Sequence, residues 1–401
     1  MSNSTDPIIV AGAGIGGLTV ALMLARRGIP VTIIEKRTAL VEAGAGIQIS
    51  PNASRILIDL GLGAALGRRA VEPKQLDIRS LKNGRRLGVM PLGEKMRTRH
   101  GAPYWVILRA DLHDVLLDAV RADSRIKLLV GRQVTGVTDH DDHASVQIEN
   151  TNGALQTVNT PLFIGADGVW SQSRRHVGDG DEPRFRNFEA WRCVISHDTL
   201  PEKFRTDEMV VWLGPNAHIV LYPVSGGTAW NIIVIVRSDE NVQDWGLPMD
   251  RERFENFVAK LSSPTLSDLH ELLSAGENWR LWSLHDALPA IRWSTNHATL
   301  LGDAAHPVLP FLAQGGALAI EDAAVLVKSL GEHPGNTSAA LNAYEQERYP
   351  RVRRVMEEAR ANGRSFHFSG PIAMVRNMLL RRFSGEYLNA RYDWLYGWRM
   401  R

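Results

Sequence analysis

Short apolar runs that end in glycine or in an acidic residue recur along this chain. Residues 8–10 are apolar and β-branched, as is typical of a strand buried on both faces of a parallel sheet. A helical pattern continues to about residue 27, Gly28 ends it, and a second strand occupies residues 31–34 before Glu35. The start of the chain therefore predicts a strand, a helix and a parallel strand.

Two later runs have the same form. Residues 162–168 and 298–303 each read as a buried strand that ends in glycine and aspartate. Ligands of open α/β sheets bind beyond the carboxyl ends of the strands, so both segments are candidates for a binding edge. We also expect helices over residues 108–120, 320–330 and 339–361, strands over residues 127–130 and 144–148, and a turn at Asn152-Gly153.

The middle of the chain alternates between apolar and polar positions, which predicts a mostly antiparallel sheet in a second domain. The alternation is incomplete, so we expect one face of this sheet to roof a cavity. A helical pattern over residues 251–273 follows the sheet, and a hairpin over residues 75–90, turning at Asn83-Gly84, precedes it. The strands are expected over residues 191–196, 209–213, 218–224 and 230–236.

The turn after the first strand carries a dinucleotide-binding signal. Gly12, Gly14 and Gly17 stand in G-x-G-x-x-G spacing, which allows a tight turn, close approach of backbone N–H groups to a pyrophosphate, and close packing of helix on strand. Glu35 stands at the end of the second strand, the position at which a carboxylate binds both hydroxyls of an adenosine ribose and disfavours a 2′-phosphate. The stretch predicts an ADP-containing dinucleotide, NAD or FAD, with a structural glycine turn as the alternative.

Composition narrows the class of protein. With 401 residues, 44% hydrophobic and 22% charged, the chain is long enough for two packed domains of globular type. The formal net charge of +2 indicates neither nucleic acid nor an anionic membrane as partner. The single cysteine, Cys193, excludes an internal disulfide, and we expect no metal site. No apolar run is long enough for a membrane span and the polar start leaves no room for a signal peptide, so we expect a cytoplasmic protein.

Three glycine and acid segments, far apart in the sequence, carry a resemblance to a known family. They are the glycines of residues 12–17, Asp167-Gly168 with Arg174 downstream, and Gly302-Asp303 with Gly315 downstream. Together they resemble the flavoprotein aromatic hydroxylases, single-component FAD monooxygenases of the 4-hydroxybenzoate hydroxylase type, over nearly the whole chain. The salicylate and 3-hydroxybenzoate hydroxylase branch looks most similar, on residues 44–53, 218–224 and 313–322.

The resemblance implies an α/β fold: a Rossmann-like FAD-binding domain of the GR2 type, an interleaved, mostly antiparallel β-sheet substrate domain, and C-terminal helices. We expect the FAD-binding domain and these helices in residues 1–75, 100–180 and 287–401, and the substrate domain in residues 76–99 and 181–286. The resemblance also implies that NADH or NADPH is a co-substrate, which reacts at the flavin without a dinucleotide-binding domain of its own.

FAD is the cofactor that the resemblance implies. Asp303 is expected near the ribityl chain and pyrophosphate, Arg109 near the pyrophosphate, and Asp167 in a segment that serves both FAD and the nicotinamide nucleotide. Ala317 stands where the family often has an asparagine near the flavin ring, so no side-chain contact is expected there. The full set of expected cofactor-binding residues is Gly12, Gly14, Gly17, Glu35, Arg37, Gln48, Arg109, Val134, Asp167, Asp303, Gly315 and Gly316.

The implied chemistry requires a base. A reduced flavin reacts with O₂ to a C4a-hydroperoxide with an electrophilic distal oxygen, and a phenol attacks it well only after losing its proton. His218 and Tyr222 are the candidate catalytic residues: they share one face of an expected strand, with Cα atoms roughly 13 Å apart, which suits two sides of a benzene ring. A structural role for this pair stays open. His306 beside Asp303 is a rival that we expect to support the flavin.

The sequence thus predicts an NAD(P)H-consuming FAD monooxygenase that hydroxylates a phenolic or heteroaromatic acid similar to salicylate or 3-hydroxybenzoate, with O₂ as co-substrate. Alternatives are a larger polyketide or quinone-like ring as substrate, an FAD dehydrogenase or oxidase without oxygenation, and a non-enzymatic nucleotide-binding scaffold. The choice of NADH or NADPH, the ring position and the oligomeric state stay open, with a homodimer as one candidate.

Overall fold

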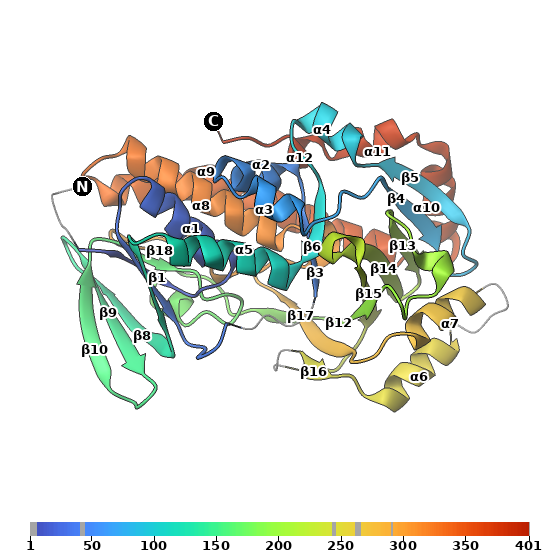
Figure 1. Ribbon diagram of the computed structural model, residues 1–401, viewed down its shortest axis with the longest axis horizontal. Helices are drawn as coiled ribbons and strands as arrows, with labels where there is room; N and C mark the ends of the chain where they lie inside the picture. Colours follow the sequence, from blue (N-terminus) through green and yellow to red (C-terminus); the bar gives the residue numbers. More distant parts are fainter. Residues whose placement is uncertain (1–5, 41–44, 243–245, 261–265, 290–291, 401) are drawn as a thin grey trace.

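The computed structural model describes residues 6–40, 45–242, 246–260, 266–289 and 292–400. Parts of three expectations lie outside these residues: residues 1–5 of the polar start, Gly44 of the stretch 44–53 that resembles the salicylate and 3-hydroxybenzoate hydroxylase branch, and residues 261–265 of the expected helical stretch. The molecule is elongated, with an α/β half at one end and a large β-sheet at the other (Figure 1).

A five-stranded parallel sheet forms the first half. Its spatial order is β18 (Ala298–Leu300), β11 (Phe163–Gly165), β1 (Ile8–Ala11), β2 (Val31–Glu35) and β7 (Ile126–Val130). The predicted first strands and both later buried strands are therefore confirmed. Because parallel strands point the same way, the loops after β1, β11 and β18 lie at one edge, which brings the three glycine segments together.

Helices cover this sheet. Helix α1 (Ile15–Arg26) packs against both α5 (Arg109–Ala122) and α8 (Gly315–Glu332). Helix α1 ends just before Gly28, whose φ of 78° is the left-handed conformation expected after a helix. Helix α8 begins at Gly315, before the expected start at residue 320, so Gly315 and Gly316 form its first turn.

An antiparallel meander of β8 (Arg132–Asp139), β9 (Ala144–Asn150) and β10 (Leu155–Thr160) contacts β2. The sequence predicted β9 and the turn at Asn152-Gly153, where Gly153 has a φ of 78°. It missed β8 and β10. Strand β10 is polar and largely exposed, so it lacks the apolar alternation on which a strand prediction rests.

The second sheet has eight strands. Strand β4 pairs with β13 in parallel, and the other neighbouring pairs are antiparallel, so the predicted hairpin β4–β5 is confirmed and joins the sheet of the middle segment. Strand β12 begins earlier than expected because a bulge between Phe185 and Glu189 lets its pairing with β17 continue. In spatial order the strands are β16 (Leu247–Pro248), β17 (Arg280–Asp286), β12 (Arg184–Ser196), β15 (Ala229–Arg237), β14 (Ala217–Val224), β13 (Met209–Gly214), β4 (Gln75–Ser80) and β5 (Arg86–Pro91).

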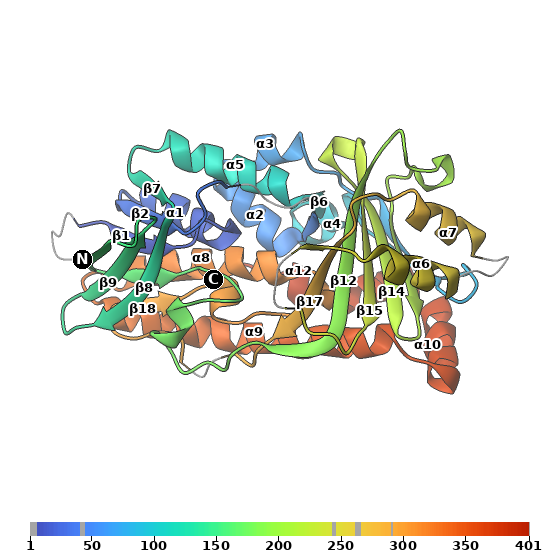
Figure 2. The same ribbon diagram turned by 90° about the horizontal axis from the view of Figure 1, so that it is seen from below.

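The two faces of this sheet differ. One face buries Trp191, Leu221 and Val234 in a core that also holds apolar residues of α6 (Arg251–Lys260) and α7 (Ser267–Ser274). These two helices make up the described part of the helical stretch that the sequence predicted, and Figure 2 shows them outside the sheet. The opposite face lines a cavity, as the incomplete alternation predicted.

The remaining elements connect the two halves. Strand β3 (Gly46–Ile49) pairs with β6 (Trp105–Leu108) and leads into α2 (Pro51–Asp59). Helix α9 (Thr337–Phe366) extends from the α/β half to the large sheet (Figure 2). The others are α3 (Gly63–Gly67), α4 (Glu94–His100), α10 (Gly370–Arg382), α11 (Gly385–Arg391) and α12 (Asp393–Tyr396).

Over the described ranges, no helix combines the length and the apolar character that crossing a bilayer requires. Across the same residues, no group of three or more His, Cys, Asp or Glu side chains is placed to hold a metal ion. Cys193 is buried on β12, and its thiol donates to the backbone oxygen of Glu277 at 2.8 Å.

Candidate active site

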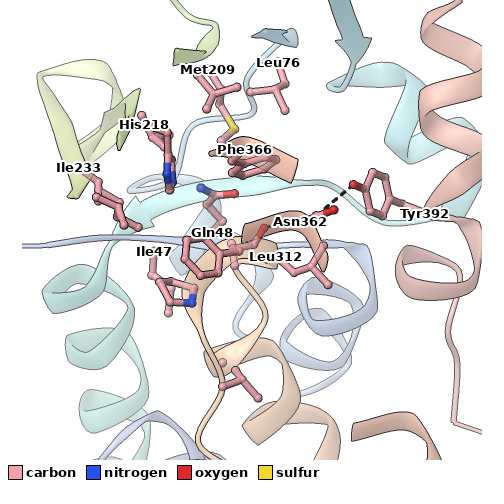
Figure 3. A pocket seen from close by; sticks show the side chains of 18 of the residues that line it. Ile47, Gln48, Leu76, Met209, His218, Ile233, Leu312, Asn362, Phe366 and Tyr392 are labelled. Carbon is pink, nitrogen blue, oxygen red and sulfur yellow. Dashed lines mark hydrogen bonds between the residues drawn. The ribbon is translucent and has the colours of Figure 1, made fainter. Parts of the chain in front are cut away.

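A cavity of about 660 Å³ lies between the two halves of the molecule. Its floor consists of the loops after β1, β11 and β18, and its roof is the inner face of the eight-stranded sheet. Figure 3 shows His218 and Ile233 of the roof, Gln48 and Ile47 of β3, and Phe366 at the end of α9 around one space. Eight of the expected site residues line the cavity: Gly14, Gln48, Arg109, Asp303, Gly315, Gly316, His218 and Tyr222.

Two helix N-termini meet the cavity floor. Gly14 precedes α1 and Gly315 begins α8, neither helix has an acidic residue in its first turn, and neither N-cap side chain accepts a capping hydrogen bond. The first N–H groups of a helix lack partners within the helix, and the helix dipole makes that end positive. A Cβ built on Gly14 meets no atom within 4 Å. The floor thus offers an open, positively polarised surface to an anionic group such as a pyrophosphate.

Gly12 and Gly17 hold the turn itself together. Gly12 has a φ of 101°, and a Cβ there would lie 2.5 Å from the backbone oxygen of Ala166. A Cβ on Gly17 would lie 2.0 Å from the backbone oxygen of Gly12. Both distances are shorter than van der Waals contact, so only glycine permits this approach of helix to strand.

Glu35 lies at the end of β2, where a ribose is expected. Its carboxylate accepts hydrogen bonds from the backbone N–H of Ala13 at 2.8 Å and of Arg37 at 2.9 Å, and it pairs with the Arg37 guanidinium at 3.1 Å. Burial opposes the charged form, but these hydrogen bonds and the arginine charge outweigh it and lower the pKa of Glu35. Glu35 is therefore a fixed anion beside the glycine turn.

Asp303 is a half-buried acid that lines the cavity. Among the described residues, its carboxylate has no hydrogen-bond partner, although Arg109 and Arg174 act on it electrostatically. Burial raises the pKa of Asp303, and His306 and the two arginines only partly offset this. A carboxylate in such a place is stabilised by a ligand that brings hydroxyl donors, as the ribityl chain of FAD does.

The other expected cofactor residues lie outside the cavity lining. Val134 is buried in the core beside a bulge of β8. The carboxylate of Asp167 accepts hydrogen bonds within its own loop, from the Ser171 hydroxyl at 2.5 Å and from the backbone N–H and hydroxyl of Ser173 at 3.0 Å. The flanking residues Ala166 and Gly168, rather than Asp167, line the cavity. The structure therefore places the Asp167 segment at the site and turns its side chain away.

His218 and Tyr222 lie on the same face of β14, as their spacing predicted, and that face lines the cavity. Tyr222 is 1% exposed, and a Cβ on Gly46 would lie 2.6 Å from its hydroxyl oxygen, so the glycine of β3 makes room for the tyrosine ring. Burial raises the pKa of Tyr222, and Arg192 and Gln48 partly offset this. Both candidates therefore stand neutral beside the space where a ring can bind.

His306 does not reach toward the cavity. Its Nε2 bonds to Asp322 at 2.7 Å, and both side chains are buried in the core beneath the loop after β18. The same Asp322 carboxylate accepts from the backbone N–H of Gly302 at 2.9 Å. His306 thus braces the loop that carries Asp303.

Arg192 is a site residue that the sequence did not single out. It lines the cavity from β12, its Nε is buried without a hydrogen-bond partner, and no carboxylate of the described residues lies within ion-pair distance. Its guanidinium carbon stands 5.2 Å from the centre of the Trp282 ring. Burial lowers the pKa of Arg192, as expected for a cation that lacks an anionic partner. The sequence offered one signal for Arg192: it is a cation at an inward-facing position of a strand that was expected to roof the cavity.

Comparison with known proteins adds the following matches. The FAD binding domain family matches residues 5–359. The chain is 37% identical over 399 residues to the 3-amino-4-hydroxybenzoate 2-monooxygenase PtmB3 of Streptomyces platensis, covering 99% of this chain and 97% of that relative. It is 35% identical over 393 residues to the 3-hydroxybenzoate 6-hydroxylase 1 of Aquipseudomonas alcaligenes, covering 97% of each. The solved structure of Klebsiella pneumoniae HpxO complexed with FAD and uric acid has a TM-score of 0.82 at 25% identity, covering 97% of this chain and 96% of that one.

Proposed function

The chain belongs to the FAD binding domain family, and from this premise we propose that it hydroxylates the ring of a phenolic acid of the 3-hydroxybenzoate type, with NAD(P)H and O₂ as co-substrates. Two relatives of nearly equal length are named for the hydroxylation of hydroxybenzoates. Their names support an oxygenase over a dehydrogenase, and a small aromatic acid over a polyketide.

FAD fits the residues at the cavity floor. We assign its pyrophosphate to the first turns of α1 and α8, its adenosine ribose to Glu35, and its ribityl hydroxyls to the unpartnered carboxylate of Asp303. Arg37, Val134 and Asp167 keep the cofactor roles expected from the sequence, as proposals. When bound, FAD supplies the redox chemistry of the reaction.

Arg192 is the observation that carries the substrate class. The Nε of Arg192 is buried without a partner and no carboxylate of the described residues pairs with this arginine, so a carboxylate from the substrate would satisfy both its charge and its donors. Apolar side chains such as Val220 and Ile233 lie on the same roof and would contact the faces of a ring. His218 would then accept the phenolic proton, and Tyr222 would stand on the far side of the ring.

A substitution at Arg192 tests the acid. Arg192→Gln is expected to raise KM for 3-hydroxybenzoate by about 10- to 100-fold, because a hydrogen bond between charged groups contributes about 1.5–3 kcal/mol. With 3-hydroxybenzyl alcohol, which has no carboxylate, wild type and variant should differ little. The measurement is steady-state NAD(P)H oxidation with product analysis, and Arg251→Gln on the exposed face of α6 is the matched control. Equal losses with the acid and the alcohol would remove Arg192 from substrate recognition.

A substitution at Asp303 tests the cofactor assignment. Asp303→Ala is expected to lose bound flavin during gel filtration, because the ligand hydroxyls lose their buried acceptor. The ratio of flavin to protein absorbance measures the loss. Asp118→Ala, on the exposed side of α5, should keep its flavin. A full flavin complement in Asp303→Ala would refute this role.

A further inference from the structure

Two histidines from distant parts of the chain meet at the cavity wall. His218 on β14 is 2% exposed, and its Nδ1 lies 2.9 Å from Nε2 of His367, the residue that caps the C-terminal end of α9. Among the described residues, the other ring nitrogen of His218, Nε2, has no hydrogen-bond partner. In Figure 3 the His218 ring points into the cavity beside Phe366. One nitrogen of the candidate base is thus occupied and the other faces the substrate space.

Within the described part of the chain, no acidic group contributes to this pair. Aromatic rings surround His218, with the centre of Phe366 at 5.2 Å and that of Phe311 at 5.7 Å. The charged groups that act on His367 are Arg237 at the end of β15 and Arg376 on α10, both cations. The pKa of His367 is lowered to about 4, mainly by burial and further by these two cations. Burial also lowers the pKa of His218 well below its usual value. Both imidazoles are therefore neutral near pH 7, and each carries one N–H.

The surroundings of His367 favour one position for its ring proton. Nε2 of His367 faces His218, and its other ring nitrogen, Nδ1, is buried without a hydrogen-bond partner among the described residues, although the backbone carbonyl of Gly363 in the last turn of α9 acts on the ring and raises its pKa. A carbonyl accepts hydrogen bonds and cannot donate them, so the Gly363 carbonyl favours the proton of His367 on Nδ1. Its Nε2 then has a lone pair, and the contact to His218 requires a proton on Nδ1 of His218.

We propose that His367 is a positioning residue that holds His218 in the tautomer with its proton on Nδ1 and its lone pair on Nε2, so that Nε2 takes the phenolic proton of the substrate. In this step the O–H bond breaks, the proton binds Nε2, and the electron pair stays on the phenolate oxygen. His367 then accepts a hydrogen bond from an imidazolium, which is stronger than one from a neutral ring. The inference rests on the proposed function, because it requires a phenolic substrate.

Packing alone is the competing explanation. The Phe188 ring stacks on His367 at 4.9 Å with an interplanar angle of 24°, so His367 could simply fill space. Two variants separate the explanations. His367→Phe keeps an aromatic ring but cannot accept a hydrogen bond, whereas His367→Gln loses the ring but offers an amide oxygen to Nδ1 of His218.

The test uses the oxidised holoenzyme and 3-hydroxybenzoate. Ultraviolet difference spectra measure the phenolate fraction of the bound ligand, and turnover with product analysis gives kcat and KM. In His367→Phe we expect the phenolate band to disappear and the kcat of hydroxylation to fall about 100-fold or more, with KM changed little. In His367→Gln we expect the band and most of kcat to return. His270→Gln, exposed on α7, is the control and should match wild type.

Several outcomes overturn the proposal. The proposal is wrong if His367→Phe behaves like wild type. It is also wrong if His367→Gln is as impaired as His367→Phe. If these variants do not fold, long-range ¹H–¹⁵N spectra of histidine-labelled wild type decide the question, because a proton on Nε2 of His218 contradicts the proposal. Wild-type enzyme that binds and hydroxylates no phenolic acid would refute the proposed function itself. Normal wild-type hydroxylation with an unaffected His367→Phe would refute the positioning role alone.

Discussion

Replacing His218 by alanine is expected to lower the yield of hydroxylated product about 10²- to 10⁴-fold while flavin reduction by NAD(P)H stays near the wild-type rate. The reason is that His218 presents Nε2 to the cavity and acts on the substrate, whereas the residues assigned to FAD lie on the floor. The phenol would remain protonated and weakly nucleophilic. Stopped-flow absorbance follows reduction, and chromatography of the reaction mixture quantifies the product.

His197→Ala is the matched control for this experiment. His197 is exposed just after β12 and lies outside the cavity lining, so product yield should be unchanged. Unchanged product formation in His218→Ala would remove His218 from the mechanism. A parallel loss of flavin reduction would point instead to a damaged cofactor site.

Replacing Arg348 by leucine is expected to destabilise the protein by about 3–5 kcal/mol, the usual result of leaving buried carboxylates without their cation. Arg348 on α9 donates to Asp322 at 2.6 Å and to Glu321 at 2.7 Å, and all three side chains are fully buried. Arg348 and His306 together lower the pKa of Asp322 to about 2 despite its burial. Without the arginine, these acids must take up protons or draw water into the core.

Urea unfolding of the holoprotein measures this change. Arg353→Leu is the control, because the Arg353–Glu357 pair on the same helix is exposed at both ends and should contribute less than about 1 kcal/mol. Arg348, Glu321 and Asp322 form a buried charge cluster, and Asp322 also holds the loop of Asp303 through Gly302 and His306. Weaker flavin binding should therefore accompany the loss of stability. Equal midpoints for the two variants would contradict this account of the cluster.

The cofactor half could be predicted from the sequence because its signals are local. Gly12, Gly14 and Gly17 follow directly from backbone sterics at one turn, and the strand ends before Asp167 and Asp303 follow from short apolar runs. Parallel pairing then brings these segments to one edge. Their side-chain contacts were not predictable in this way, since the Asp167 carboxylate caps its own loop and that of Asp303 faces the cavity.

The substrate half depended on contacts between distant segments. The period of two placed His218 and Tyr222 on one face of β14, but strand pattern alone cannot say which face of the sheet meets the cavity. Arg192 became a site residue only through the register of β12 with β15, and His367 only through the meeting of α9 with β14. The domain boundaries expected from the sequence stay a prediction.

The most direct test of the account is stopped-flow flavin reduction by NADH and by NADPH, with and without 3-hydroxybenzoate or salicylate, followed by product analysis in air. The account predicts that one of these acids strongly accelerates reduction and is recovered with one added hydroxyl group, and that its methyl ester needs about 10- to 100-fold higher concentration for both effects because it offers no carboxylate to Arg192. Fast reduction that no phenolic acid affects, with no hydroxylated product, would contradict it.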